Sequence, residues 1–460
     1  MNEEKRSITA RSLTQTAAGL AIHAADESKP LTPLLHFIRG VKGTHLFVPN
    51  GSRLIPISPA IEERLRRLVE NKDERNIQDE LLALGLDIPP LISDEPLKDP
   101  PTYALSLAIA QKCNMGCAYC YADQGDFGGP TKSMPIDTAL KSIDLLLKGR
   151  NAGDRVQLTF LGGEPLINRQ DIRTAAKYAQ QKAEEKALNI GFSITTNGTL
   201  LTEDDAAFFE NFGFAVTISL DGNKEEHNQL RPMKNGTGSY ERIIEKIQPL
   251  LRRQRKMQVS ARVTVTPRNM NLARTLDDLI AMGFHSVGFS PLLNSGNGKG
   301  EMSRQDLEIL LQNMIECGLK FEKNVLQGKR YPFLNMINAL KEIAKGTHRP
   351  YPCGAGAGYM GVSADGELAA CHRFVNEPAG RMGDIFNGID SQLQNKWLAE
   401  RHVHRQSPCS QCWARYLCGG GCHHEVIEKG RIACDYIRGW LHFTLQSYER
   451  INRLVPNWMN

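Results

Sequence analysis

The chain has 460 residues, of which 41% are hydrophobic and 23% charged, and its formal net charge is +5. This length leaves room for two or three domains, and the composition is that of a globular protein. So small a positive charge does not argue for a nucleic-acid partner. No apolar run is long enough for a membrane span, and the N-terminus lacks the apolar core of a signal peptide, so we expect a cytoplasmic protein.

The eleven cysteines are clustered in the sequence. Three lie at 113–120 and seven at 353–434, while Cys317 stands alone within a helical pattern. In a large chain without a secretion signal, such clusters favour metal or redox chemistry over disulfides. We expect Cys317 to be a small buried residue of a helix core.

Residues 1–30 are expected to form a disordered arm, followed by a small α+β module and linker at 31–100. "THLFVPNGSRLIPISP" predicts two strands around a turn. "SPAIEERLRRLVE" predicts a helix with Ser58 as its N-cap, and "NIQDELLALGL" predicts a second one. The Pro-rich "DIPPLISDEPLKDPP" reads as a linker. The module resembles small peptide-recognition domains, which capture a peptide by strand addition; a plain structural cap fits the pattern equally well.

From residue 101 to about 340, six predicted strands alternate with helices. This pattern predicts an α/β fold with a parallel sheet, curved into a partial (β/α)6 barrel. Functional loops should follow the carboxyl ends of the strands. The cysteine loop, "GGEP", "TNGT" and "SLDG" all fall at such ends. The strands are expected within "YALSLAIAQ", "RVQLTFLGG", "IGFSITTNG", "FAVTISLDG", "QVSARVTVT" and "SVGFSPL".

The composition changes in residues 341–460, where glycine and cysteine become frequent and long helical patterns disappear. We expect a loop-rich module whose own core is too small to hold it together without metals.

The segment "KCNMGCAYCYADQG" places Cys113, Cys117 and Cys120 in a C-x-x-x-C-x-x-C loop. Three thiolates can hold a four-iron cluster and leave its fourth iron open, as catalytic metal sites require. This spacing, with Tyr119 before the last cysteine, resembles the radical S-adenosylmethionine (SAM) enzymes. The resemblance implies that SAM binds the open iron and is cleaved to a 5′-deoxyadenosyl radical, which abstracts hydrogen from a substrate.

Companion motifs follow in the order found in that family. "LGGEP" resembles its GGEP segment, in which Glu164 would accept from the SAM ammonium, and "TTNGT" and "SLDG" resemble segments that line the ribose and methionine. Arg231 is a candidate partner of the SAM carboxylate. The predicted cofactor-binding residues are Tyr119, Gly162, Gly163, Glu164, Pro165, Thr196, Asn197, Ser219, Asp221 and Arg231.

The C-terminal cysteine spacing resembles the SPASM extension of radical SAM peptide-modifying enzymes. That resemblance implies two auxiliary four-iron clusters, making three [4Fe-4S] clusters in all. The first would be held by Cys353, Cys371 and Cys422, with its fourth ligand unassigned. The second would be held by Cys409, Cys412, Cys418 and Cys434.

Two other interpretations of the cysteines remain open. A zinc module could use His372, His423 and His424 beside the cysteines. The whole chain could also be a non-catalytic iron–sulfur or zinc scaffold. The open three-cysteine loop followed by "GGEP" argues against the scaffold.

The segment "ACHRFVNEPAGRMGDI" bears on the reaction. In anaerobic sulfatase maturases, which oxidise Ser or Cys to formylglycine, an acid follows this cysteine and acts as a base; here His372 takes its place. The segment "CHRFV", together with "YADQGDFGG", "SPLLNSGNGKG" and "YLCGGGCHHE", instead resembles the thioether-forming quinohemoprotein amine dehydrogenase maturases. That resemblance implies Cys-to-Asp/Glu cross-links in a small Cys-containing protein, electrons from a flavodoxin or ferredoxin, and Asp384 or His372 as base. A formylglycine maturase, or a maturase forming another cross-link, is the alternative.

Overall fold

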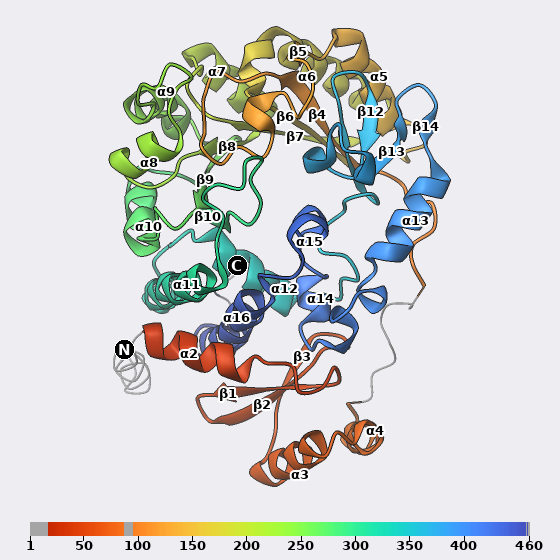
Figure 1. Ribbon diagram of the computed structural model, residues 1–460, viewed down its shortest axis with the longest axis vertical. Coiled ribbons are helices and arrows are strands. Elements are labelled where there is room, and N and C mark those ends of the chain that lie inside the picture. Colours follow the sequence, from red (N-terminus) through yellow and green to blue (C-terminus); the bar gives the residue numbers. More distant parts are fainter. Residues whose placement is uncertain (1–16, 87–94, 457, 459–460) are drawn as a thin grey trace. The chain divides into compact units, whose positions relative to one another are not determined.

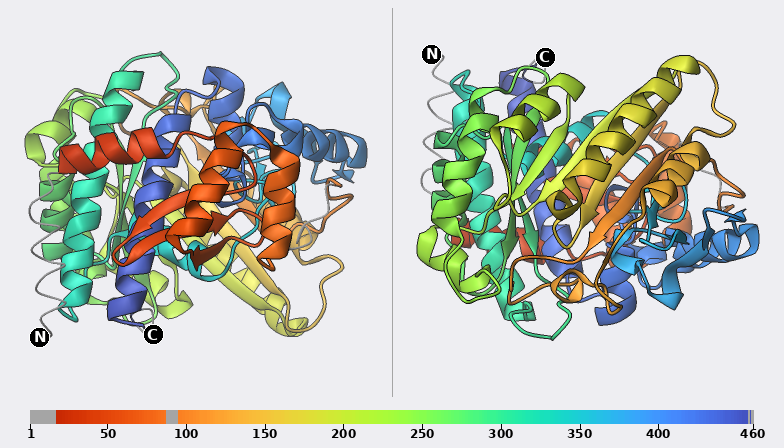
Figure 2. Two further views of the ribbon diagram at one scale, coloured as in Figure 1. Left: turned by 90° about the horizontal axis from the view of Figure 1, so that it is seen from below. Right: turned by 90° about the horizontal axis from the view of Figure 1, so that it is seen from above.

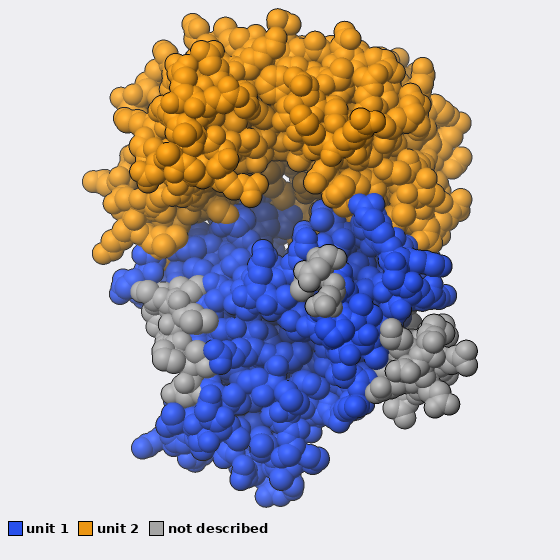
Figure 3. Space-filling model, turned by 180° about the vertical axis from the view of Figure 1, so that it is seen from behind, with its two compact units in different colours: residues 1–96, 303–353, 400–460 blue, residues 97–302, 354–399 orange. Residues whose placement is uncertain are grey.

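The computed structural model describes residues 17–86, 95–456 and 458, and it divides into two compact units. Unit 1 comprises residues 1–96, 303–353 and 400–460, and unit 2 comprises 97–302 and 354–399 (Figure 3). The units cut across the domain boundaries expected from the sequence. Residues 303–340 belong to unit 1, and residues 354–399 belong with the strands of the barrel.

Unit 2 is built on a sheet whose core is six parallel strands, as the alternating pattern predicted. Each strand pairs in parallel with the next in the order β10-β9-β8-β7-β6-β4. The strands are β4 (Ala104–Gln111), β6 (Arg155–Gly162), β7 (Asn189–Thr196), β8 (Ala215–Ser219), β9 (Gln258–Val265) and β10 (Ser286–Pro291).

Helices follow these strands and cover one face of the sheet (Figures 1 and 2). Along β9, Val259, Ala261, Val263 and Val265 are buried, while the residues between them are partly or fully exposed. One face of the sheet is therefore apolar and the other carries hydroxyl groups, such as the bonded pair Ser260 and Ser286. The helices are α5 (Ile136–Leu147), α6 (Arg169–Glu185), α7 (Glu203–Phe212), α8 (Lys224–Leu230), α9 (Tyr240–Arg252) and α10 (Leu272–Ala281).

Beyond β4 the sheet continues into the C-terminal segment of unit 2. Strand β11 (Tyr359–Val362) pairs in parallel with β4, and β12 (Glu367–Ala369), β13 (Arg381–Asp384) and β14 (Gly388–Ile389) follow antiparallel. The short β5 (Lys132–Ser133) also pairs with β4, and α13 (Ser391–Arg401) follows β14 in the chain.

Unit 1 contains the predicted hairpin, β2 (Gly43–Val48) and β3 (Arg53–Pro56), extended by β1 (His36–Gly40) into a three-stranded antiparallel sheet. As predicted, Ser58 caps α3 (Pro59–Glu70), which is followed by α4 (Glu74–Ala83). Cys317 is fully buried in its helix, as expected. The remaining helices are α2 (Ala17–Glu27), α11 (Arg304–Leu326), α12 (Leu334–Ala344), α14 (Arg415–Cys418), α15 (His423–Lys429) and α16 (Cys434–Leu454).

Two expectations about secondary structure were wrong. The alanine-rich α2 forms within the segment expected to be disordered, because it packs against α11 and α16. Long helices also persist after residue 350, since α16 runs for 21 residues from Cys434. Its buried residues Leu441 and Leu445 join a core with Trp413 and Phe47. The first 16 residues of the expected arm and residues 87–94 of the linker lie outside the described residues.

Candidate functional site

The predicted motif loops converge at the carboxyl ends of the unit 2 strands. The Gly163 amide donates to the Ala110 carbonyl oxygen (2.8 Å), and the Glu164 amide donates to that of Lys112 (2.9 Å). Asn114, inside the cysteine loop, donates through Nδ2 to Thr199 Oγ1 (2.8 Å). The loops after β4, β6 and β7 thus form one hydrogen-bonded surface around the three cysteines.

Two glycines let the GGEP turn lie against the cysteine loop. A Cβ atom added to Gly163 would lie 2.4 Å from the Lys112 carbonyl oxygen and 2.7 Å from Gly125 Cα. Gly162 has φ +150°, and a Cβ there would lie 2.2 Å from the Ala110 carbonyl oxygen. Any larger residue at either position would push the two loops apart. Pro165 is buried directly after this turn.

The three thiols of the loop lie in a shared, mostly buried environment. Burial raises the pKa of Cys113 to about 12, and the charges of Glu164, Cys117 and Cys120 contribute to this rise. Nitrogen donors also reach the Cys113 sulfur: Met115 N donates to Sγ (3.4 Å), and Asn197 Nδ2 lies 3.8 Å from the same atom. Such thiols ligate as thiolates only where a cation compensates the cost of ionising them.

Glu164 is fully buried and anchors the β7 loop. Thr196 Oγ1 and the Leu166 amide donate to its Oε1 (2.7 and 3.0 Å), and the Asn197 amide donates to its Oε2 (2.8 Å). Burial raises the pKa of this carboxyl group, and the three hydrogen bonds oppose that rise. Glu164 therefore holds the loop in place through contacts within the protein, and the predicted contact with SAM stays a prediction.

A second buried network joins the cysteine loop to the loops after β8. The Tyr119 hydroxyl donates to Asp221 and accepts from Arg231 Nη1 (2.6 Å), while Asp221 Oδ1 accepts from the Thr264 amide (2.7 Å). Burial raises the pKa of Asp221, and the Arg231 charge, 3.9 Å away, counteracts that rise. Among the described residues, the buried Nε of Arg231 has no hydrogen-bond partner.

His227 supports this network and was missed by the sequence analysis. Its Nδ1 accepts from the Asp221 amide (3.1 Å), and its Nε2 contacts Ser239 Oγ (3.0 Å), which donates to the Arg231 carbonyl oxygen. Burial and the Arg231 charge lower the pKa of His227 to about 3, so the ring is neutral near pH 7. Asn114 was missed as well, although its position between two ligand candidates is a usable signal.

The four cysteines assigned to the second auxiliary cluster all lie in unit 1 and influence one another. Burial raises the pKa of Cys418 to about 12, and the charges of Cys409, Cys412 and Cys434 contribute to this rise. The Gly420 amide bonds to Cys418, and the Ala414 amide and the Arg438 side chain bond to Cys412. The structure thus brings these four residues together.

The residues assigned to the first auxiliary cluster are divided between the units. Cys353 and Cys422 are exposed residues of unit 1, and Cys371 is a buried residue of unit 2. This ligand set stays a prediction. His423 and His424, the zinc candidates, are buried in α15.

The two base candidates differ in their surroundings. Asp384 lies in a hairpin turn, where it accepts from the Phe386 and Asn387 amides (both 2.8 Å). Hydrogen bonds from Asn387 and Phe386 lower its pKa, so the geometry gives no support to Asp384 as a base. His372 Nδ1 instead lies 2.8 Å from the Tyr359 hydroxyl, which is 2.7 Å from Ser106 Oγ on β4.

Within the described residues, no three His, Cys, Asp or Glu side chains converge on one ion-sized position. A four-iron cluster does not need such convergence, because each thiolate binds a different iron atom. None of the described helices combines the length and apolar character of a membrane span.

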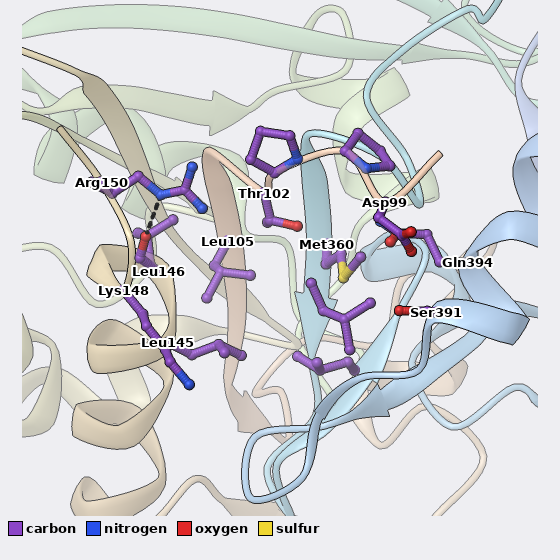
Figure 4. Close-up of a pocket in the computed structure, with 14 residues that line it drawn as sticks. Asp99, Thr102, Leu105, Leu145, Leu146, Lys148, Arg150, Met360, Ser391 and Gln394 are labelled. Carbon is purple, nitrogen blue, oxygen red and sulfur yellow. Dashed lines mark hydrogen bonds between the residues drawn. The ribbon is translucent and has the colours of Figure 1, made fainter. Parts of the chain in front are cut away.

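A separate pocket of about 270 Å³ opens at the amino end of β4 (Figure 4). Its floor includes Leu105 and Met360, and Arg150, held by the Leu146 carbonyl oxygen, lies at one side. None of the predicted site residues lines it, so it is distinct from the cysteine loop.

Comparison with known proteins agrees with this geometry. Residues 107–290 match the model of the Radical SAM superfamily. The chain is 24% identical over 360 residues to a Serine-type anaerobic sulfatase-maturating enzyme of Klebsiella aerogenes, covering 75% of this chain and 86% of that protein. It is 26% identical over 342 residues to a Cysteine-type enzyme of Clostridium novyi, covering 70% and 88%.

Solved structures show the same fold. Native anSMEcpe with bound AdoMet superposes with a TM-score of 0.62 at 20% identity, covering 77% of this chain and 99% of that one. The same protein with bound AdoMet and Cp18Cys peptide gives 0.62 at 21% identity, covering 78% and 100%. The comparisons confirm the radical SAM α/β fold. They favour the sulfatase-maturase alternative over the expected resemblance to quinohemoprotein amine dehydrogenase maturases.

Proposed function

We propose that this chain is a radical SAM maturase that modifies a side chain of a protein substrate. The observation that carries the proposal is the set of three thiols at the carboxyl ends of the strands, joined by buried networks to Glu164, Asp221 and Arg231. When bound at Cys113, Cys117 and Cys120, a reduced four-iron cluster with SAM supplies a radical that abstracts hydrogen.

The residues present fit these groups. Amides around Cys113 and Cys120 point donors at the sulfurs, as in iron–sulfur sites where such bonds tune the potential. The Nε atom of Arg231, which has no hydrogen-bond partner among the described residues, can donate to a carboxylate such as that of SAM. Tyr119 and Asp221 fix the guanidinium in place, so less conformational entropy is lost on binding.

The cysteine-rich segments are proposed to hold two auxiliary four-iron clusters. Cys409, Cys412, Cys418 and Cys434 would form a closed set, supported by their mutual influence and by the amide donors around them. Cys353, Cys371 and Cys422 would hold the other cluster. Electrons would arrive from a flavodoxin- or ferredoxin-type protein.

The relatives favour a Cys or Ser side chain as the position of attack, because both Cysteine-type and Serine-type sulfatase-maturating enzymes match the chain. Oxidation to formylglycine is therefore the first candidate reaction. Thioether formation between Cys and a carbon of Asp or Glu is the second. His372 favours the second, because it stands where the sulfatase maturases carry an acid, and Tyr359 orients it. In either reaction His372 is the candidate proton acceptor.

An intact-mass and alkylation assay separates the two reactions. The chain would be produced anaerobically with the small Cys-containing protein encoded beside it, and in parallel incubated with the Cp18Cys peptide. Loss of sulfur with gain of a carbonyl establishes formylglycine. Loss of two hydrogens per site, with sulfur retained and the thiol no longer alkylated, establishes a thioether. Unmodified substrates combined with a failure to cleave SAM would contradict the proposed function and favour the non-catalytic scaffold.

A further inference from the structure

The side-chain amide of Asn197 faces the sulfur atom of Cys113. Asn197 directly follows β7 and is buried, with 5% of its surface exposed. Its Nδ2 atom lies 3.8 Å from Cys113 Sγ, within hydrogen-bonding range of a sulfur, and donates to Asn114 Oδ1 (3.0 Å). The two hydrogens of this amide group therefore have two acceptors, and one of them is a predicted cluster ligand.

The orientation of this amide group is fixed by its partners. Asn197 Oδ1 accepts from the Thr199 amide (2.9 Å) and from Thr199 Oγ1 (2.7 Å). Thr199 Oγ1 in turn accepts from Asn114 Nδ2 (2.8 Å), which closes a ring of three side chains. In a flipped Asn197, the nitrogen would face the Thr199 amide and two donors would meet. The nitrogen of Asn197 therefore points to Cys113, and its oxygen points away.

The backbone of Asn197 is held by the GGEP turn. Its amide donates to Oε2 of the buried Glu164 (2.8 Å), while Oγ1 of the preceding Thr196 donates to Oε1 (2.7 Å). Because both the main chain and the side chain of Asn197 have partners, little conformational entropy remains to oppose its bond to the sulfur.

The other donors to the sulfurs of this loop are backbone amides. Met115 N donates to Cys113 Sγ (3.4 Å), and Cys120 accepts from two amides within residues 122–124. Among the described residues, Asn197 is the one side chain that donates to a sulfur of the loop. It is thus the donor that a single substitution can remove without altering the backbone of the cysteine loop.

We propose that Asn197 donates to the thiolate of Cys113 and raises the reduction potential of the cluster bound there, with Asn114 as a positioning residue. This inference rests on the proposed function, because it requires a four-iron cluster at Cys113, Cys117 and Cys120. A hydrogen bond to a ligand sulfur stabilises the form with more negative charge. The Asn197 amide therefore favours the uptake of one electron from the flavodoxin- or ferredoxin-type donor.

The test is a redox titration of the anaerobically reconstituted full chain without SAM, followed by electron paramagnetic resonance. The signal that is lost in Cys117→Ser identifies the loop cluster. Asn197→Ala should shift its reduction equilibrium about tenfold toward the oxidised form, which is about 59 mV for one electron. Asn197→Asp keeps the acceptor for Thr199 but presents an oxygen to the sulfur, so it should shift the equilibrium further. The matched control is Asn189→Ala at the opposite end of β7, where Nδ2 donates to the Gly153 carbonyl oxygen, and it should leave the potential unchanged.

Equal midpoint potentials in the natural chain, Asn197→Ala and Asn197→Asp would overturn the proposal. This holds even if the variants retain less iron, because a purely structural role changes the occupancy of the loop and leaves the potential of the bound cluster unchanged. A second measurement uses the natural chain, in which the side-chain amide of asparagine carries nitrogen-15. A nitrogen-15 coupling to the reduced loop cluster that Asn197→Asp removes would support the proposal, and the absence of any such coupling would overturn it.

Failure of this inference is distinguishable from failure of the proposed function. If the natural chain gives no signal that Cys117→Ser removes, the loop holds no cluster and both fail. If the signal is present and its potential does not depend on Asn197, this inference alone fails.

Discussion

Replacing Glu164 with Gln tests whether this carboxylate holds the β7 loop. The substitution keeps the size of the side chain but turns one oxygen into an amide group. Oε1 could still accept from Thr196 and Leu166, whereas the Asn197 amide would face another donor. A hydrogen bond to a charged group contributes about 1.5–3 kcal/mol. We therefore expect local opening of residues 195–199 to become about 10- to 150-fold more frequent.

Hydrogen exchange followed by mass spectrometry measures this effect directly. Under conditions in which the loop recloses faster than it exchanges, the exchange rate of residues 195–199 reports the opening equilibrium. The matched control is Glu185→Gln, an exposed residue of α6 that pairs with Lys182, and it should leave the 195–199 segment unchanged. If Glu164→Gln exchanges no faster than this control, the anchoring role of Glu164 is refuted.

Three further predictions concern stability. Gly163→Ala should lower the free energy of unfolding in guanidinium by about 1–3 kcal/mol, because its methyl group overpacks the cysteine loop. Gly358→Ala is the control, since a Cβ there meets no atom within 4 Å, and it should leave this free energy unchanged. Equal free energies of unfolding for the two variants would contradict the close approach of Gly163 to the cysteine loop. Because the folded pKa of His227 is depressed to about 3, the unfolded chain binds more protons between that pH and about 6.5. Stability should thus fall as the pH is lowered through this window, and the fall should be smaller in His227→Gln; an identical fall would show that this group is not responsible. Glu322→Ala should cost about 3–5 kcal/mol because it leaves Arg450 without its buried partner, and a midpoint unchanged from that of the exposed control Glu241→Ala would contradict this.

The barrel could be predicted from the sequence because local signals agree with the tertiary arrangement. Each strand is apolar on the side that packs against helices, and each motif follows a strand end. The approach of the loops could be expected for the same reason, since the carboxyl ends of parallel strands share one edge. By contrast, α8 was missed because it is short and polar, and its capping box at Asn223 and Glu226 was the available signal.

Other features depend on contacts between distant segments. The helix α16 begins at Cys434, so a cysteine-rich pattern concealed its amphipathic continuation. The network of His227, Asp221 and Arg231 joins residues whose types alone do not reveal their partners. Asp384 was a candidate base in the sequence, and in the structure its carboxylate accepts hydrogen bonds from the Phe386 and Asn387 amides of its own turn.

The central claim is that the three-cysteine loop of this chain cleaves SAM. The most direct test is to reduce the anaerobically reconstituted chain in the presence of SAM and to measure 5′-deoxyadenosine, comparing the natural chain with Cys117→Ser and Cys412→Ser. We predict that the natural chain forms 5′-deoxyadenosine and that Cys117→Ser forms none while retaining the iron of the other cysteines. Cys412→Ser should keep cleavage. The account would be contradicted if Cys117→Ser formed as much product as the natural chain, or if the natural chain, with iron bound at the loop, formed none.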